Sequence, residues 1–410
     1  MEAATGSSPQ PKPGGAAGGA RNLTFATIAF ALCFSAWGMI APIAPDIQDE
    51  LGLSDTQTSI MIAIPVVLGS LLRLPFGVLT DRIGGHKVFA FMLVYTALAA
   101  LLVGFASSYA ALLGAGLLLG VTGASFAVGI PFVAEWTPPK RQGWALGVYG
   151  VGNIGTAVAA FSVPAIRDSA GQEVAGLVFA AVIAVYALIW WSVARDVPGR
   201  KPKKQPYGEV LRSGWDLYRL SLFYFVTFGG FVAMAIYLPK LLTDWFDLSL
   251  TDAGLRAAGF TILATASRPV GGVLADRFGG SRVLTVAFIG VGIDAIGLSW
   301  QAADPSMVPV TILCLTMAAF LGAGNGAVFK MVPAFYPNAT GAATGIVGAA
   351  GGLGGFFPPL LLGIVKDATG EFTIGFVLLV AFAWMCAGLA LALLEVRPAP
   401  EPGGEGAVPS

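Results

Sequence analysis

The stretch RLPFGVLTDRIGG covers residues 73–85, and a near copy, RPVGGVLADRFGG, covers residues 268–280. Each copy places an arginine eight residues before Asp-Arg, and each arginine lies inside an apolar run long enough to span a lipid bilayer. Eight helical residues rise about 12 Å, which is close to half of a hydrocarbon core of roughly 30 Å. We therefore expect Arg73 and Arg268 near the membrane midplane, where a charge is costly and indicates a function.

The composition is that of an integral membrane protein. Of the 410 residues, 56% are hydrophobic and 11% are charged, and the mean hydropathy is +0.78. The net charge of zero argues against nucleic acid as a partner. Cys33, Cys314 and Cys386 lie in apolar runs without CxxC spacing, so we expect neither a disulfide nor a metal site. We also expect no cofactor, no catalytic residue and therefore no enzyme, and the sequence implies no protein partner.

Apolar runs of spanning length recur twelve times between residues 22 and 395. They predict an all-α membrane protein of twelve transmembrane helices in two pseudo-symmetric six-helix bundles. The predicted parts are a disordered cytoplasmic tail (1–21), an N-terminal bundle (22–195), a cytoplasmic linker (196–216), a C-terminal bundle (217–395) and a second cytoplasmic tail (396–410).

The positions of lysine and arginine predict the orientation, because cytoplasmic loops retain these residues. Sixteen of the 23 fall in segments on the same side as the N-terminus. Three fall inside the membrane, namely Arg73, Arg268 and Lys330, and four fall in the opposite loops, namely Arg167, Lys240, Arg256 and Lys366. We therefore predict a multi-pass protein of the cell membrane, surrounded by lipid, with both termini and the linker in the cytoplasm.

The two halves also match outside the arginine motif. Glycine and alanine positions of the fifth run return in the eleventh, and Gly120 and Pro131 of the fourth run return as Gly322 and Pro333 in the tenth. Such parallel repeats are related by an axis along the membrane normal, and the substrate site lies at the midplane between them. Arg73 and Arg268 are therefore predicted on opposite sides of a central cavity, which describes an anion site.

Counting about ten residues inward from the predicted cytoplasmic end of each helix brings seven further residues to the same layer: Gly123, Phe126, Asn153, Tyr224, Phe228, Gly351 and Gly352. Asn and Tyr can donate to the oxygens of an anion, and glycine lets a small ligand meet the backbone. Simpler explanations stay open. Helix packing accounts for the glycines, core packing for the phenylalanines, and an interhelical hydrogen bond for Asn153. We expect Asp81, Arg82, Asp276 and Arg277 to make helix-end contacts.

A family resemblance follows from these motifs. The pattern Gly-x-x-x-Arg-x-Pro-x-Gly-x-x-x-Asp-Arg-x-Gly-Gly at residues 69–85 resembles the loop 2-3 motif of the major facilitator superfamily. The intramembrane arginine and the glycine-rich runs 143–155 and 341–355 resemble the nitrate/nitrite porter family. The resemblance implies that Arg73 and Arg268 clamp nitrate, that Asn153 and Tyr224 hydrogen-bond or support it, that Phe126 and Phe228 sandwich it, and that Gly123 leaves room.

We therefore expect an alternating-access carrier of nitrate, and of nitrite, that serves nitrate assimilation by nitrate/proton symport or by nitrate/nitrite exchange. Lys330 is the candidate for proton coupling, because desolvation and two nearby arginines would favour its neutral form in an empty site. The alternative for Lys330 is a side chain that reaches toward the cytoplasm. An exchanger of another small anion, such as a carboxylate, and an anion channel are the alternative functions.

Overall fold

The computed structural model describes residues 16–138, 142–200, 207–212, 214–336, 340–370 and 372–392, and their regular structure is helical. The first half consists of α1 (Ala16–Trp37), η1 (Ala41–Ile43), α2 (Ala44–Leu51), α3 (Asp55–Leu71), α4 (Arg73–Ile83), α5 (Gly85–Gly104), α6 (Tyr109–Gly120), η2 (Val121–Ala124), α7 (Ser125–Trp136), α8 (Gln142–Gly150), η4 (Val151–Ile154), α9 (Gly155–Ala170) and α10 (Gln172–Val193). After the short α11 (Tyr207–Leu211), the second half consists of α12 (Trp215–Phe246), α13 (Leu250–Phe278), α14 (Gly280–Gln301), α15 (Met307–Phe335), α16 (Thr340–Leu353), α17 (Phe357–Thr369) and α18 (Thr373–Ala392).

Within the described residues, eleven helical segments are long and apolar enough to cross a membrane. The twelfth predicted span corresponds to α13, which has 29 residues but carries Arg268 and several charges near its ends. The predicted fold class is confirmed. Residues 1–15, 201–206, 213 and 393–410, which include most of both predicted tails and part of the linker, lie outside the described residues.

The first helix is described from Ala16 onward, so residues 16–21, which were assigned to the tail, are helical. Gly18 and Gly19 explain this extension, because both lie against Trp136 at the end of α7. A Cβ atom on Gly18 would be 3.0 Å from the indole ring of Trp136, and one on Gly19 would be 3.0 Å from its carbonyl oxygen. Tertiary packing therefore extends the helix beyond the apolar run from which its start was predicted.

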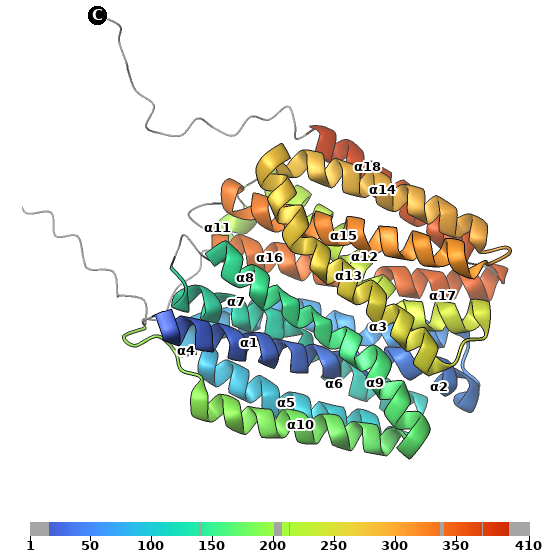
Figure 1. Cartoon of the computed structure of the whole chain (residues 1–410), viewed down its shortest axis with the longest axis horizontal. Helices are drawn as coiled ribbons and strands as arrows, with labels where there is room; N and C mark the ends of the chain where they lie inside the picture. Colours follow the sequence, from blue (N-terminus) through green and yellow to red (C-terminus); the bar gives the residue numbers. More distant parts are fainter. Residues whose placement is uncertain are drawn as a thin grey trace, which may run out of the picture.

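Equivalent helices of the two halves pack in equivalent ways (Figure 1). In the first half α5 packs on α10, α3 on α6 and α1 on α9, and in the second half α14 packs on α18, α13 on α15 and α12 on α16. Across the interface, α3 meets α17 and α9 meets α13. This is the packing that parallel six-helix repeats predict.

The two halves approach most closely toward the distal end, which we define as the end where α3 begins and α17 ends. A Cβ atom on Gly254 of α13 would lie 1.8 Å from the carbonyl oxygen of Ala160, and one on Gly363 of α17 would lie 2.2 Å from Ser59 Oγ. Only glycine fits such contacts between helices. The opposite end, where α1 begins at Ala16, is called the proximal end.

Candidate functional site

Four membrane-spanning segments are interrupted around one central region. The second breaks between α3 and α4 at Leu72, the fourth and fifth contain the 3₁₀ turns η2 and η4, and the eleventh breaks between α16 and α17. Pro75 explains the first break, because it has no N–H to donate to the carbonyl of Leu71. Short 3₁₀ stretches inside helices often mark functional sites. The interruptions place Arg73, Gly123 and Asn153 within or beside irregular backbone.

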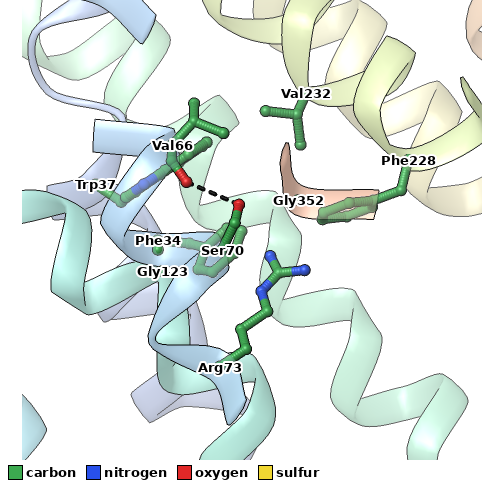
Figure 2. Close-up of a pocket in the computed structure, with 10 residues that line it drawn as sticks. Phe34, Trp37, Val66, Ser70, Arg73, Gly123, Phe228, Val232 and Gly352 are labelled. Carbon is green, nitrogen blue, oxygen red and sulfur yellow. Dashed lines mark hydrogen bonds between the residues drawn. The ribbon is translucent and has the colours of Figure 1, made fainter. Parts of the chain in front are cut away.

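A narrow pocket with a volume of only about 10 Å³ lies at this region (Figure 2). Four of the predicted site residues line it, namely Arg73, Gly123, Phe228 and Gly352. Sequence reasoning missed the other six lining residues, which are Phe34, Trp37, Val66, Gly69, Ser70 and Val232. Ser70 could have been found, because it precedes Arg73 by three residues and therefore shares its helix face.

Arg73 is buried, with 4% of its surface exposed, and its guanidinium bridges the two halves. Its Nη1 donates a hydrogen bond to the carbonyl oxygen of Gly348 on α16, and its Nε has no partner among the described residues. The guanidinium carbon lies 5.5 Å from the ring centroid of Phe126 and 5.1 Å from that of Phe228. Figure 2 shows this group pointing between Ser70 and Phe228. Cation–π contact with two rings holds the charge without neutralising it.

Arg268 lies on the continuous helix α13 and faces the same phenylalanine. Its guanidinium carbon is 5.3 Å from the ring centroid of Phe228 and 5.0 Å from that of Phe231. The buried Nε and Nη2 atoms have no hydrogen-bond partner among the described residues. The structure therefore brings the two predicted arginines to one aromatic ring, Phe228, and no described carboxylate forms an ion pair with either of them.

Further aromatic rings pack next to Phe228. Tyr224 stacks on Phe228 with ring centroids 4.9 Å apart and an angle of 8° between the ring planes, and its buried hydroxyl has no partner among the described residues. Phe329 of α15 meets Tyr224 edge-on at 4.8 Å and lies 6.1 Å from Phe126 across the interface. Tyr224, Phe126 and Phe228 are therefore in one cluster, as predicted. Phe329 is a further member that sequence reasoning missed.

The remaining predicted residues complete the surroundings. Asn153 is fully buried, its Nδ2 donates to Gly150 O at 2.7 Å, and its Oδ1 has no partner among the described residues. The Tyr224 ring packs on Gly351, where a Cβ atom would lie 2.0 Å from Cδ1. A Cβ atom on Gly352 would lie 2.3 Å from Ser70 Oγ and 3.1 Å from Arg73 Nη1. These glycines make room for side chains of the site.

The structure does not show the desolvation that was expected of Lys330. Its side chain is 54% exposed, and its Nζ forms an ion pair with Asp276, whose side chain is equally exposed. Apolar residues surround Lys330 in the sequence, but on α15 its side chain lies on an exposed face and pairs with Asp276 of α13. The alternative of a lysine that reaches toward the cytoplasm stays a prediction.

Asp276 thus takes part in a contact near the end of α13, as expected for this motif. In the first half, Arg200 Nη2 donates to the carbonyl oxygens of Thr80 and Asp81 at 2.6 Å, and Arg200 Nε pairs with Glu135 at 3.0 Å. Arg200 therefore fastens the end of α4 to α7. Of the other two motif residues, Arg82 is exposed, and Arg277 lies over the ring of Phe278 at 5.4 Å.

A cluster of charged and polar groups joins the halves at the distal end, and sequence reasoning missed it. Lys240, which was assigned to an outer loop, lies inside α12 and is fully buried, because α12 continues to Phe246. The distal ion cluster is defined as Gln48, Asp55, Lys240, Asp244, Lys366 and Asp367. Lys240 Nζ lies 2.7 Å from Gln48 Oε1, 2.8 Å from Asp55 Oδ1 and 2.9 Å from Asp244 Oδ2.

Two further residues of the distal ion cluster, Lys366 and Asp367, add contacts at the distal end. Lys366 Nζ lies 2.5 Å from Asp244 Oδ2, and the Asp367 carboxylate accepts hydrogen bonds from the backbone N–H groups of Asp55 (3.0 Å) and Thr56 (2.8 Å). Asp367 of the second half therefore caps the first turn of α3 in the first half. The structure shows a conformation in which the distal end is closed by charge-assisted bonds.

The two repeated helix bundles, with an unpaired cationic site between them, define a secondary transporter. The chain belongs to the major facilitator superfamily, whose sequence profile matches residues 26–359 and 220–409. It is 38% identical over 365 residues to a "Probable nitrate transporter NarT" of Staphylococcus epidermidis. The aligned region covers 89% of this chain and 94% of that protein. It is also 39% identical over 363 residues to a "Nitrite extrusion protein" of Bacillus subtilis. The aligned region covers 87% of this chain and 90% of that protein.

A solved structure shares the fold. The inward-facing, occupied crystal structure of a bacterial homologue of the human lysosomal transporter Spinster matches with a TM-score of 0.69. The sequences are 18% identical, and the match covers 92% of this chain and 97% of the other. The comparisons confirm the predicted superfamily and the transporter class.

Proposed function

We propose that this transporter carries nitrate and nitrite, and that Arg73 and Arg268 bind the anion together. The observation that carries the proposal is that the two guanidinium groups lie 5.1 and 5.3 Å from the same ring, Phe228, without a carboxylate partner among the described residues. Two unpaired cations in a low-dielectric region repel each other, so the site is most stable when an anion lies between them. The names of the two relatives support nitrate and nitrite as that anion.

The chemistry of the site supports a small planar anion. Guanidinium groups are planar and present parallel N–H donors, so they match a flat oxyanion better than a lysine ammonium does. The stacked rings of Phe228 and Tyr224 form an apolar surface beside the charges. The Tyr224 hydroxyl, which has no partner among the described residues, adds a polar group to the same cluster and can donate to an anion oxygen.

We propose exchange of nitrate for nitrite as the mode of transport. Proton coupling through Lys330 required a desolvated lysine beside the arginines, and Lys330 is exposed and paired with Asp276. In the described part of the chain, the charged side chains in the aromatic cluster are the two arginines. A guanidinium stays protonated at physiological pH, so this site carries its charge through the cycle and needs an anion in each direction.

The orientation is part of the same proposal. The distal end, with its ion cluster, faces the outside of the cell membrane, and the proximal end faces the cytoplasm together with both termini. The distribution of lysine and arginine supports this orientation. A single cysteine introduced at Gly208 of α11 should react only with a membrane-permeant reagent in intact cells. Efficient reaction with an impermeant reagent would reverse the orientation.

Counterflow in proteoliposomes tests the function. Vesicles loaded with nitrite should take up labelled nitrate at equal pH on both sides, and empty vesicles should not, with or without a pH gradient. Vesicles that contain the Arg73→Lys variant serve as the control for leakage. Accumulation of nitrate driven by a pH gradient in empty vesicles would contradict exchange, and transport of a carboxylate in preference to nitrate would contradict the substrate.

A further inference from the structure

The described part of the chain contains three asparagines that are at most 1% exposed, and their amide groups differ in how well they are satisfied. Asn22 Nδ2 donates to Gly18 O at 2.9 Å, and its Oδ1 accepts from the backbone N–H of Arg195 at 3.2 Å. Asn153 makes one bond and leaves Oδ1 free. Neither amide atom of Asn325 has a partner among the described residues. An unsatisfied buried amide costs about 1–3 kcal/mol, so Asn325 requires an explanation.

The helix face on which Asn325 lies directs its side chain into the second bundle. Leu321, Asn325 and Phe329 are four residues apart on α15 and form one stripe. At one end of the stripe, Leu321 lies against Gly230 of α12, where a Cβ atom would be 3.1 Å from Leu321 Cδ2. At the other end, the Phe329 ring meets Tyr224 of α12 at 4.8 Å. Asn325 therefore faces α12, one turn from the aromatic cluster.

Two glycines that flank Asn325 fix its depth in the bundle. A Cβ atom on Gly326 would lie 2.0 Å from the carbonyl oxygen of Arg268, and one on Gly324 would lie 2.5 Å from Thr227 Cγ2. The backbone at Asn325 is thus packed against the backbone that carries Arg268 on α13 and against the residue that precedes the central phenylalanine on α12. The amide lies in the layer of the second arginine.

Other polar groups in this layer are also unsatisfied. The hydroxyls of Thr227 and Thr265 are buried and have no partner among the described residues, as is true of Nε and Nη2 of Arg268. Threonines in helices commonly donate to the carbonyl four residues back, as Thr96 does here at 2.7 Å. Thr227 and Thr265 do not, so α12, α13 and α15, which pack together, each carry buried polar atoms without a partner among the described residues.

The internal repeat places Asn325 opposite a residue of the cavity. The fourth span maps onto the tenth with a shift of 202 residues, which makes Asn325 the counterpart of Gly123, a lining residue. The fifth span maps onto the eleventh with a shift of 198 residues, which makes Gly351 the counterpart of Asn153. Each half therefore has one asparagine and one glycine at these positions. In the first half the glycine is on the fourth span and the asparagine on the fifth, and in the second half the asparagine is on the tenth span and the glycine on the eleventh.

We propose that Asn325 is a second anion-binding amide, the counterpart in the C-terminal half of Asn153. Its Nδ2 donates to an oxygen of a small planar oxyanion held by Arg268, and its Oδ1 accepts a hydrogen bond from the free Arg268 guanidinium N–H groups. The inference rests on the proposed transport of nitrate and nitrite and extends it. An asparagine suits this position because one amide both binds the anion and orients the arginine.

Titration calorimetry of the purified full-length protein with nitrate and with nitrite tests this role, together with the midpoint of thermal unfolding. Asn325→Leu removes the polar atoms at similar volume, and Asn325→Ala removes them without added bulk. Both should raise the Kd for nitrate about tenfold or more, the scale of a hydrogen bond to a charged group. The unfolding midpoint should stay the same or rise, because no protein hydrogen bond is lost.

Asn22→Leu is the matched control, because Asn22 is equally buried but has partners for both amide atoms. It should lower the unfolding midpoint and leave the Kd unchanged. Wild-type affinity in both Asn325 variants would overturn the inference and leave the nitrate function standing. A lowered midpoint with unchanged affinity would assign Asn325 a structural role instead. Failure of the unmodified protein to bind nitrate and nitrite would overturn both proposals.

Discussion

Arg73 and Arg268 occupy equivalent places in the repeat but have different surroundings. Arg73 lies at a helix break and donates to Gly348 O in the other half, whereas Arg268 lies in an unbroken helix with two buried nitrogens free. The carbonyl that Arg73 uses belongs to α16, so this bond must break if the halves separate at the proximal end. The comparison indicates that Arg73 serves both closure and anion binding, while Arg268 takes no part in this bond between the halves.

The largest effect should come from replacing either arginine by lysine. Arg73→Lys or Arg268→Lys keeps the charge but removes the parallel donors, so nitrate binding should weaken by about 4 kcal/mol, or about a thousandfold in Kd. Titration calorimetry on purified variants measures this directly. Expression should be normal, and near wild-type affinity in either variant would refute the bidentate role of that arginine.

A smaller effect should separate the two arginines by disturbing Arg73 alone. Gly352→Ala would place a methyl group 2.3 Å from Ser70 Oγ and 3.1 Å from Arg73 Nη1, so Ser70 must shift and the guanidinium beside it is crowded. We expect nitrate affinity to fall by about 3 kcal/mol, the upper end of the usual cost of overpacking. Gly348→Ala on the same helix is the control, because a Cβ atom there meets nothing within 4 Å. Equal affinities of the two variants would contradict the crowding of Arg73.

The fold and the centre of the site could be predicted from the sequence because their signals are local. A charge inside an apolar run is visible in the sequence, and two copies of one motif place two such charges at one depth. Counting helical turns also predicted that Tyr224 and Phe228 lie together, and the structure stacks their rings.

What the sequence could not provide is the direction in which a side chain points. Lys330 and Asn325 are five residues apart on α15, yet the lysine is more than half exposed and the asparagine is 1% exposed. Depth along a helix is readable from residue number, but rotation about its axis depends on the neighbours that pack against it. Packing against neighbours also decides how far a helix extends. Lys240 was assigned to a loop, but α12 continues past it, and Asp55 and Asp244 neutralise its charge.

Phe228, which both arginines contact, should control selectivity rather than binding as such. Phe228→Ala removes the ring that both guanidinium groups contact and widens the site, so discrimination between nitrate and larger anions should weaken by roughly 1–3 kcal/mol. Competition of unlabelled anions with labelled nitrate gives the ranking. Phe225→Ala on the same helix is a control, because that ring packs on Phe357 and Phe382 away from both arginines. An unchanged ranking in Phe228→Ala would leave this ring only a packing role.

The smallest effect should come from the hydroxyl of Tyr224, which lies in the cluster that both arginines share. This hydroxyl is buried without a partner among the described residues, so Tyr224→Phe removes no protein hydrogen bond and keeps the stacking on Phe228. If the hydroxyl donates to the anion, nitrate affinity should fall by about 0.5–1.5 kcal/mol while the unfolding midpoint holds or rises. The same loss of affinity is then measured in a protein that also carries Arg268→Lys, which tests whether the hydroxyl and Arg268 act on the same anion. Additive losses in that double-mutant cycle would mean that the hydroxyl acts independently of Arg268, whereas a loss that disappears would show that both groups hold one anion oxygen.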